Sequence, residues 1–455
     1  MTEKPAASAS DTVEGQRLKG ENASEWREWG PYLSERQWGT VREDYSADGD
    51  AWAYFPHDHA RSRAYRWGED GLAGFSDKSQ HWCLGLALWN EHDPILKERL
   101  FGLTSEDVKE LYFYLDGVPS HAYMRMLYKY PQAAFPYNDL VTENARRGLG
   151  DAEYEILDTG VFEDDRYFDV TVEYAKQGPN DIVMRISVHN RFHQPARLRV
   201  LPQLWARNDW SWNEHARRPS LSLLGERVDA RHPGCDPMQA SAWGDAPFEW
   251  LFCENETNTR RLEGSQADGP FKDGINDHVV SGAPSIRRDS GTRVAAHFCL
   301  QLQGGETRTV HLRFAPPEAP QINARRLFEN RRQEADDFYG TRRRRCPPGP
   351  APGPGRPAVV QATLLLRRKP VARRRPGPTP AASRALDSTR QPLATPVELR
   401  HRLHAGQMGV PLVRLLGPGF PGRGLRPDRS GLCQAATAAP GQRSLHAPQR
   451  PVAGL

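Results

Sequence analysis

The stretch D-V-T-V-E-Y-A-K-Q-G-P-N-D-I-V-M-R-I-S-V, residues 169–188, decides the fold class of this chain. Apolar residues alternate with polar ones from 169 to 175 and again from 182 to 188. This period of two is typical of a half-buried strand. Gly178, Pro179 and Asn180 lie between the two runs and favour a turn. The stretch therefore predicts two antiparallel strands joined by a short connection.

The same alternation recurs further along the chain. It is found over residues 196–205, 294–302 and 308–314, with Gly304 and Gly305 between the last two runs. Consecutive alternating strands with short connections favour antiparallel sheets packed face to face. We therefore expect a mainly β fold, in which a large antiparallel β-sandwich covers residues 36–316 and helices are few.

Two segments have helical spacing instead. Residues 120–128 carry apolar side chains three and four positions apart, with Ser120 placed to cap a helix and Pro131 to stop it. Residues 321–339 place apolar residues at wider intervals among charged ones, which predicts a linker helix within 317–340. Residues 1–35 are polar and predict a flexible lead-in, with docking expected only near Trp26 and Trp29.

The chain joins two different compositions at about residue 340. Residues 1–340 hold 40 Lys and Arg against 54 Asp and Glu, whereas residues 341–455 hold 21 Lys and Arg against three acids. All 12 Trp and all 14 Tyr precede position 341, while 19 of the 38 Pro follow it. The second part has no sustained period of either kind, so it predicts a disordered basic tail.

The basic tail could belong to a nucleic-acid binder through its arginine runs at 342–345 and 373–375. Binders of single strands interleave such charges with aromatic residues, and Phe420 is the only aromatic residue of the tail. We therefore expect no nucleic-acid partner.

Targeting and redox signals are absent from the sequence. The six cysteines show no CxxC spacing, residues 1–30 lack the apolar run of a signal peptide, and no window is apolar enough for a membrane span. These features predict a reduced, cytoplasmic chain with no membrane partner and no metal or other cofactor.

Residues 106–175 are unusually dense in Tyr and Phe for a stretch that is also polar. Such a mixture suits a wet surface that stacks on sugar rings or on a neighbouring domain. The alternative is an ordinary β-rich core with tyrosines at its rim, and composition alone favours that alternative.

Several stretches resemble a known family. They are R-Q-W-G-T-V-R-E-D-Y-S at 36–46, P-H-D-H-A-R-S-R-A-Y-R-W-G-E-D-G at 56–71, D-P-I-L-K-E-R-L-F-G-L-T at 93–104 and, from residue 106, E-D-V-K-E-x-Y-F-Y-L-D, Y-K-Y-P-Q-A-A-F-P-Y, Y-E-I-L-D-T-G-V-F and D-R-Y-F-D-V. They resemble the N-terminal region of long bacterial members of glycoside hydrolase family 63, relatives of the processing α-glucosidases and mannosylglycerate hydrolases. The resemblance continues more loosely to about Tyr339, and a few Gly-rich residues of the relatives are missing between Thr104 and Glu106.

The resemblance implies a fold and a substrate class. In the family, an N-terminal sandwich leads through a helical linker to an (α/α)6-barrel catalytic domain. The substrates are glycosides or oligosaccharides with α-linked gluco- or manno-configured sugars. The barrel is not recognisable in residues 341–455 as they stand.

The tail resembles that barrel when its codons are read in a shifted frame. Joining the last two bases of each codon to the first of the next forces TGG, tryptophan, at Met408–Gly409, because methionine has only the codon ATG. Permitted codons for residues 403–420 then encode S-M-P-D-K-W-E-Y-P-W-F-A-S-W-D-L-A-F, and residues 371–380 and 445–454 also give family-like strings in the right order. We expect a frameshift between about Tyr339 and Val359; a genuine disordered tail is the alternative.

Glycoside hydrolysis needs two carboxyl groups on either side of the scissile bond. The chain offers Glu69 with Asp70, and Glu163 with Asp164 and Asp165. Adjacent acids on a strand point to opposite faces, and on a loop they are usually solvated, so neither set is assigned as catalytic. The family's general acid is the Asp of W-D, whose bases are read here as Leu416-Gly417-Pro418, and its second carboxylate is expected beyond Leu455. No catalytic or metal residue is therefore assigned.

Two further motifs carry weaker signals. His57-Asp58-His59 has an H-x-H spacing that suits a metal, but with no third ligand evident a turn or strand with surface histidines is the better interpretation. The motif at Trp67–Gly71 matches the family and is expected either to face the sugar or barrel or to form a structural turn. No Walker, G-x-G-x-x-G or G-x-S-x-G motif is present, which gives no support to nucleotide binding or serine hydrolysis.

The sequence thus predicts a truncated, α-glucosidase-like glycoside hydrolase that carries the sandwich but lacks the catalytic carboxylates and is inactive as translated. The alternatives are a sugar-binding sandwich module and, on charge alone, a nucleic-acid binder.

Overall fold

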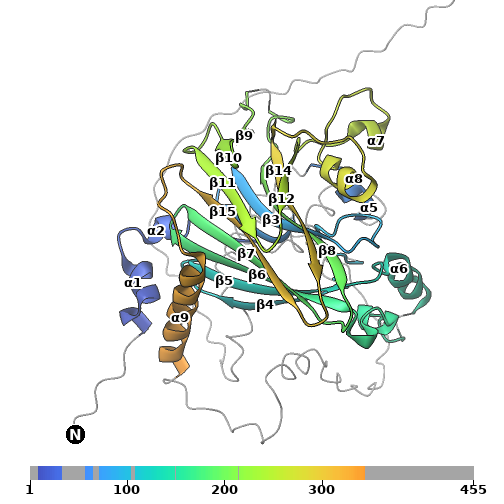
Figure 1. The fold of residues 1–455 in the computed structure, drawn as a ribbon, viewed down its shortest axis with the longest axis horizontal. Coiled ribbons are helices and arrows are strands. Elements are labelled where there is room, and N and C mark those ends of the chain that lie inside the picture. The colour runs from blue at the N-terminus through green and yellow to red at the C-terminus, as the bar shows by residue number, and fades with distance from the viewer. Residues whose placement is uncertain are drawn as a thin grey trace, which may run out of the picture. The chain divides into compact units, whose positions relative to one another are not determined.

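The computed structural model describes residues 9–32, 57–64, 71–103, 108–148, 150–213 and 215–343. The expected tail falls outside these ranges from residue 344 onward, as do Glu69 and Asp70. The described residues form two large antiparallel sheets with a few helices around them (Figure 1).

The smaller sheet has six strands, and every neighbouring pair is antiparallel. Its strands, in spatial order, are β1 (Trp29–Pro31), β2 (Leu72–Asp77), β3 (Trp82–Trp89), β8 (Ala196–Ala206), β14 (Arg293–Leu302) and β12 (Phe248–Cys253). Strands β3, β8 and β14 are buried along most of their length, which makes them the centre of this sheet.

The larger sheet has nine strands and is also antiparallel throughout. In spatial order they are β13 (Ser290–Gly291), β9 (Ser220–Leu224), β10 (Arg227–Arg231), β11 (Met238–Gly244), β15 (Thr307–Ala315), β7 (Asp181–Asn190), β6 (Tyr167–Gly178), β5 (Tyr123–Pro131) and β4 (Leu111–Gly117). One hydrophobic core contains residues of both sheets, such as Leu84 and Leu86 of β3 with Val170 and Val172 of β6. The predicted antiparallel β-sandwich is confirmed.

The deciding stretch forms the hairpin β6–β7, with Val170 opposite Val188 and Gly178 opposite Asp181. The other two expected neighbours, β14 and β15, lie in different sheets, so the chain crosses the sandwich at Gly304 and Gly305. A Cβ on Gly304 would lie 2.2 Å from the carbonyl oxygen of His193, and Gly305 has a φ of 75°. Both positions of the crossing therefore require glycine.

The helices lie at the rim of the sandwich (Figure 1). They are α1 (Val13–Lys19), α2 (Ala23–Trp26), α5 (His57–Ala60), α6 (Tyr137–Arg146), α7 (Thr259–Glu263), α8 (Gly274–Ser281) and α9 (Ala324–Arg343), with single 3-10 turns η1 (Ala9–Asp11), η2 (Ile156–Thr159) and η3 (Glu163–Asp165). The segment 317–340 was expected to hold a linker helix, and helix α9 covers residues 324–343. That this helix leads to a further domain stays a prediction. Its Leu327 and Phe328 pack against Tyr123 and Val183 of the larger sheet.

The expectation of a flexible lead-in over residues 1–35 does not hold for residues 9–32. Glu14 of α1 is buried and accepts hydrogen bonds from the backbone N–H and the hydroxyl of Ser120, at 2.8 and 2.7 Å. Arg17 pairs with Glu334 of α9 at 2.5 Å, and Trp29 is buried. The polar residues of this segment suggested that it is solvated, whereas in the structure they pair with the rest of the domain.

The predicted helix over residues 120–128 is wrong, because this segment enters strand β5. Met126, Tyr128 and Tyr130 are buried while Leu127 and Lys129 are only half-buried. This period of two competes with the helical spacing just before it. Pairing with β4 on one side and β6 on the other decides between them.

Within the described ranges, no helix combines the length and the apolar character needed to cross a membrane.

Candidate functional site

A pocket of about 420 Å³ lies where α5 and α7 meet the loop that follows β8. It is lined by Arg63, Ala64, Ser211, Trp212, Glu256, Thr257, Thr259, Glu263, Ala267, Asp268 and Phe271. Helices α5, α7 and α8 gather at one side of the sandwich, beside strands of the smaller sheet (Figure 1).

The buried carboxylate of Asp273 holds the pocket's segments together. It accepts hydrogen bonds from the hydroxyl of Ser62 at 2.6 Å and from the side-chain amide of Asn258 at 3.0 Å, and it pairs with Arg261. The ammonium group of Lys272 donates to the carbonyl oxygen of Arg63 at 2.6 Å. These contacts fix three segments of distant sequence around one space.

Trp212 lies in the loop after β8 and is 46% exposed, the most exposed tryptophan of the described residues. Asn208 anchors this loop, because its amide donates to the carbonyl oxygen of Asn255 at 2.8 Å and to the hydroxyl of Ser211 at 2.9 Å. The backbone N–H of Ser211 in turn donates to the side chain of Asn208 at 3.0 Å. The loop is therefore held in place while its indole remains open to solvent.

Carboxylates and hydroxyls complete the lining. Glu256 accepts a hydrogen bond from the indole N–H of Trp210 at 2.8 Å and pairs with Arg218 at 2.9 Å. Glu263 and Asp268 are exposed, so their oxygens are accessible. An aromatic face beside hydrogen-bond acceptors and hydroxyls is an arrangement that can bind a polar ring with one apolar face, because the ring stacks while its hydroxyls are bonded.

The acids considered from sequence do not line this pocket. Glu69 and Asp70 lie outside the described residues. Glu163, Asp164 and Asp165 form the turn η3 and are exposed, and Asp164 lies 3.9 Å from Arg166.

The H-x-H motif forms the short helix α5 rather than a turn or strand. The ring of His57 packs against those of Phe101 and Tyr137, with centroids 5.2 and 5.3 Å away, and Asp58 pairs with Arg61 at 2.5 Å. His57 is therefore a packed residue next to the pocket's Arg63 segment. Of the motif at 67–71 the structure describes only Gly71, which lies against the ring of Trp205.

Sequence reasoning missed Trp212 as a site residue. Its signal was the W-S-W pair at 210–212, set among Asn, Asp and Glu. Two tryptophans in so polar a segment cannot both be buried in the sandwich core, and Trp210 lies only half-buried against it.

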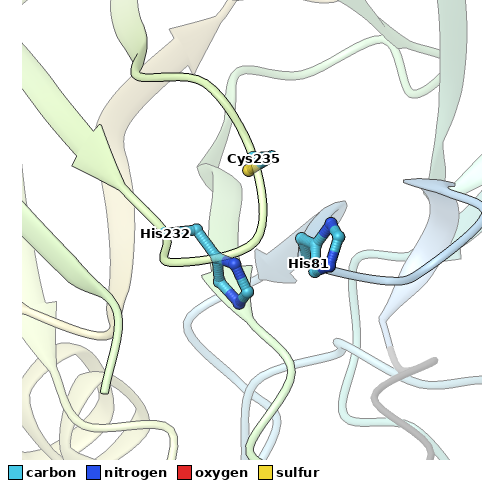
Figure 2. Close-up of side chains that lie close together, drawn as sticks. All are labelled: His81, His232 and Cys235. Atoms are coloured by element: carbon cyan, nitrogen blue, oxygen red, sulfur yellow. The ribbon is translucent and has the colours of Figure 1, made fainter. Parts of the chain in front are cut away.

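A second group of residues, which could bind a metal ion, lies outside this pocket. His81, His232 and Cys235 bring three potential metal-ligand atoms within 4.8 Å of one another (Figure 2). None of them lines the pocket beside Trp212.

Comparison with known proteins gives one clear sequence relative. A scan against protein-family models finds no match. An uncharacterized protein of Saccharomyces cerevisiae is 40% identical over 389 aligned residues, which cover 72% of this chain and 36% of the yeast protein. The chain thus spans about a third of that relative's length.

Solved structures give remote similarities only. They include a protein described as a kojibiose phosphorylase from the human microbiome (TM-score 0.20, 8% identity, 39% of this chain and 21% of that chain). A polysaccharide lyase matches with a TM-score of 0.27 and 11% identity over 61% of this chain and 29% of its own. A family GH92 inverting mannosidase of Bacteroides thetaiotaomicron matches with a TM-score of 0.18 and 10% identity over 52% and 30%.

Proposed function

We propose that the described domain is the N-terminal sandwich of a protein related to glycoside hydrolase family 63, and that the pocket beside Trp212 binds a sugar ring. The observation that carries the sugar-binding part is the exposed indole of Trp212 in a pocket lined by carboxylates and hydroxyls. The substrate class is a glycoside or oligosaccharide with α-linked gluco- or manno-configured sugars.

Two observations support a sandwich that belongs to a larger enzyme. The family-like stretches run from residue 36 to about residue 339 and so cover every strand of the sandwich except β1, together with most of α9. The yeast relative extends far beyond the aligned region, since that region is 36% of its length. The catalytic carboxylates would then lie in a separate domain, and the sandwich would contribute substrate contacts.

We further propose that a frameshift near codon 340 separates this chain from its catalytic domain. The shifted reading of residues 403–420 supports it, because it recovers W-E-Y-P-W and then W-D without a gap. On this proposal the chain as translated is a truncated glycosidase that has no hydrolytic activity. Sequencing the gene between codons 339 and 359 tests this directly; an intact frame that continues through the basic residues would refute it.

We also propose that the protein works in the cytoplasm without a nucleic-acid partner. Cys235, Cys253 and Cys299 are free thiols, which suits a reducing compartment. The basic residues after 341 lack the aromatic residues that stack on bases.

Sugar binding is tested by titrating the full chain with α-linked glucose and mannose disaccharides, followed by tryptophan fluorescence and calorimetry. We expect weak saturable binding that Trp212→Ala reduces at least tenfold and that Glu263→Gln also weakens. Glu306→Gln changes a half-buried carboxylate that pairs with Arg308 outside the pocket, so it should leave binding unchanged. Equal affinity in Trp212→Ala and the unaltered chain would remove the pocket from the proposal.

A further inference from the structure

Three metal-ligating side chains from the two sheets meet at one edge of the sandwich. His81 lies in the turn between β2 and β3 of the smaller sheet, whereas His232 and Cys235 lie in the loop between β10 and β11 of the larger one. Figure 2 shows His232 and Cys235 on the same loop, across from His81 on the segment that enters β3. Their ligand atoms lie within 4.8 Å of one another, and the two imidazole rings have centroids 4.5 Å apart.

The nitrogen atoms of the two histidines converge on Gly234. A Cβ built on Gly234 would lie 2.7 Å from Nε2 of His81 and 3.3 Å from Nδ1 of His232. The backbone N–H of Gly234 donates to Nδ1 of His232 at 3.0 Å, so the lone pair of that ring is on Nδ1. Each histidine thus turns one nitrogen toward the same small space, which a side chain at position 234 would fill.

His81 has the outer support that metal-binding histidines usually have. Its other nitrogen, Nδ1, lies 3.4 Å from the carboxylate of Asp77. That carboxylate is itself fixed by the backbone N–H groups of Ser79 and Trp82, each at 2.9 Å. A carboxylate on Nδ1 sets the ring orientation and leaves Nε2 as the electron-pair donor.

We propose that His81, His232 and Cys235 bind one zinc ion, which cross-links the two sheets of the sandwich. Two imidazoles and one thiolate are the donors that Zn²⁺ prefers, and with three protein ligands the fourth position is left to a water molecule. Tetrahedral zinc with such ligands needs ligand atoms roughly 3.3–3.6 Å apart. A contraction of about 1 Å at the exposed loop 232–237 would achieve this.

Each ligand has to give up one interaction when zinc binds. The Nδ1 lone pair of His232 accepts the backbone N–H of Gly234, and this hydrogen bond breaks when Nδ1 turns to the metal. The exposed thiol of Cys235 releases its proton to solvent as the Zn–S bond forms.

Cobalt titration tests the site, because a thiolate bound to Co²⁺ gives a sulfur-to-metal charge-transfer band in the near ultraviolet. The experiment uses the full chain with Cys346→Ser and Cys433→Ser, so that thiols after residue 343 cannot contribute to this band. We expect one equivalent of Co²⁺ to produce the band and Zn²⁺ to abolish it by displacement. Cys235→Ser should lose the band, and Asp77→Asn should weaken Co²⁺ binding about 10- to 100-fold while keeping it.

The matched control is Cys299→Ser, because Cys299 is another exposed thiol near a histidine, His297. It should bind Co²⁺ as the parent does. Circular dichroism and the melting temperature in chelator report whether each variant is folded, and His81→Gln provides a ligand variant in the other sheet. A full charge-transfer band in Cys235→Ser, or no band in the folded parent chain, would overturn the proposal.

Discussion

The ammonium group of Lys176, on strand β6, donates a hydrogen bond to the carbonyl oxygen of Trp29 at 2.9 Å and another to that of Trp26. Burial lowers the pKa of this lysine to about 7, while the carboxylates of Glu14 and Glu28 oppose that change. One buried lysine thus joins the N-terminal segment to the larger sheet and titrates near neutrality.

This relationship predicts that the free energy of unfolding rises with pH between about 7 and 9. The unfolded lysine keeps its ordinary pKa of 10.5, so in this range the unfolded chain binds a proton that the folded chain does not. The slope should reach up to about 1.4 kcal/mol per pH unit. Urea denaturation at several pH values measures it. Lys176→Met should flatten the profile, whereas Lys19→Met, at an exposed lysine of α1, should not; an unchanged slope in Lys176→Met would contradict this.

We predict that Glu14→Ala destabilises the domain by about 1–3 kcal/mol, because the substitution leaves the buried N–H and hydroxyl of Ser120 without their acceptor. Glu25→Ala, at an exposed position of α2, should change stability by less than about 0.5 kcal/mol. Thermal melts of the two variants distinguish a docked N-terminal segment from a solvated one. Equal melting temperatures would favour the solvated segment.

We predict a larger loss for Lys97→Met. The ammonium group of Lys97 lies 2.6 Å from the carboxylate of Glu110, and both side chains are fully buried. Burial raises the pKa of Glu110, and its oxygens also accept from the N–H of Phe101 at 2.7 Å and the hydroxyl of Tyr128 at 2.5 Å. Removing the lysine leaves that charge uncompensated, at a cost of about 3–5 kcal/mol.

The double variant Lys97→Met with Glu110→Gln checks the cause of that loss. It removes the isolated charge and should recover part of the stability of the single variant. Denaturation midpoints at a fixed pH provide the comparison. If the double variant is no more stable than Lys97→Met, packing rather than charge determines the loss.

Frame restoration near codon 340, with the coding sequence that follows codon 455, should yield an inverting α-glycosidase. The Asp read from the codons now giving Gly417 and Pro418 would act as general acid, with its pKa raised by the recovered tryptophans. Changing that Asp to Asn should reduce turnover by orders of magnitude without unfolding the enzyme. Proton NMR of the first-formed product reports its anomeric configuration, and retention would refute the inverting mechanism.

The sandwich could be predicted from sequence where the pattern was local. Strands β6 and β7 could be predicted from their alternation and from the turn residues between them, and helix α9 from its widely spaced apolar residues among charged ones. Strand β5 could not, since its first residues have helical spacing and only the pairing with β4 and β6 resolves it. Periodicity also does not tell which sheet a strand joins, so the placement of β14 and β15 in different sheets could not be predicted.

The sites were harder to predict because they are assembled from distant segments. The H-x-x-C spacing of His232 and Cys235 is visible in the sequence, but a search for pairs of cysteines does not find it. His81 comes close to them only through the packing of the two sheets. Likewise, nothing local links Trp212 to Arg63 or Phe271. Their proximity depends on Asp273, whose carboxylate joins Ser62, after α5, to Asn258 and Arg261 of the α7 segment.

The order of strands in the smaller sheet has a consequence for synthesis on the ribosome. Strand β3 pairs with β8, and β8 pairs with β14, so the centre of this sheet is incomplete until residue 302 has left the exit tunnel. The apolar strand W-C-L-G-L-A-L-W at 82–89 can pair with β2 as soon as it is made, but its other edge stays open until β8 has been synthesised at residue 206. Pairings this distant in sequence form slowly, and open edges of apolar strands aggregate during that delay. The nascent chain should therefore need a chaperone that covers the open edge of β3 during the translation of more than 100 further residues.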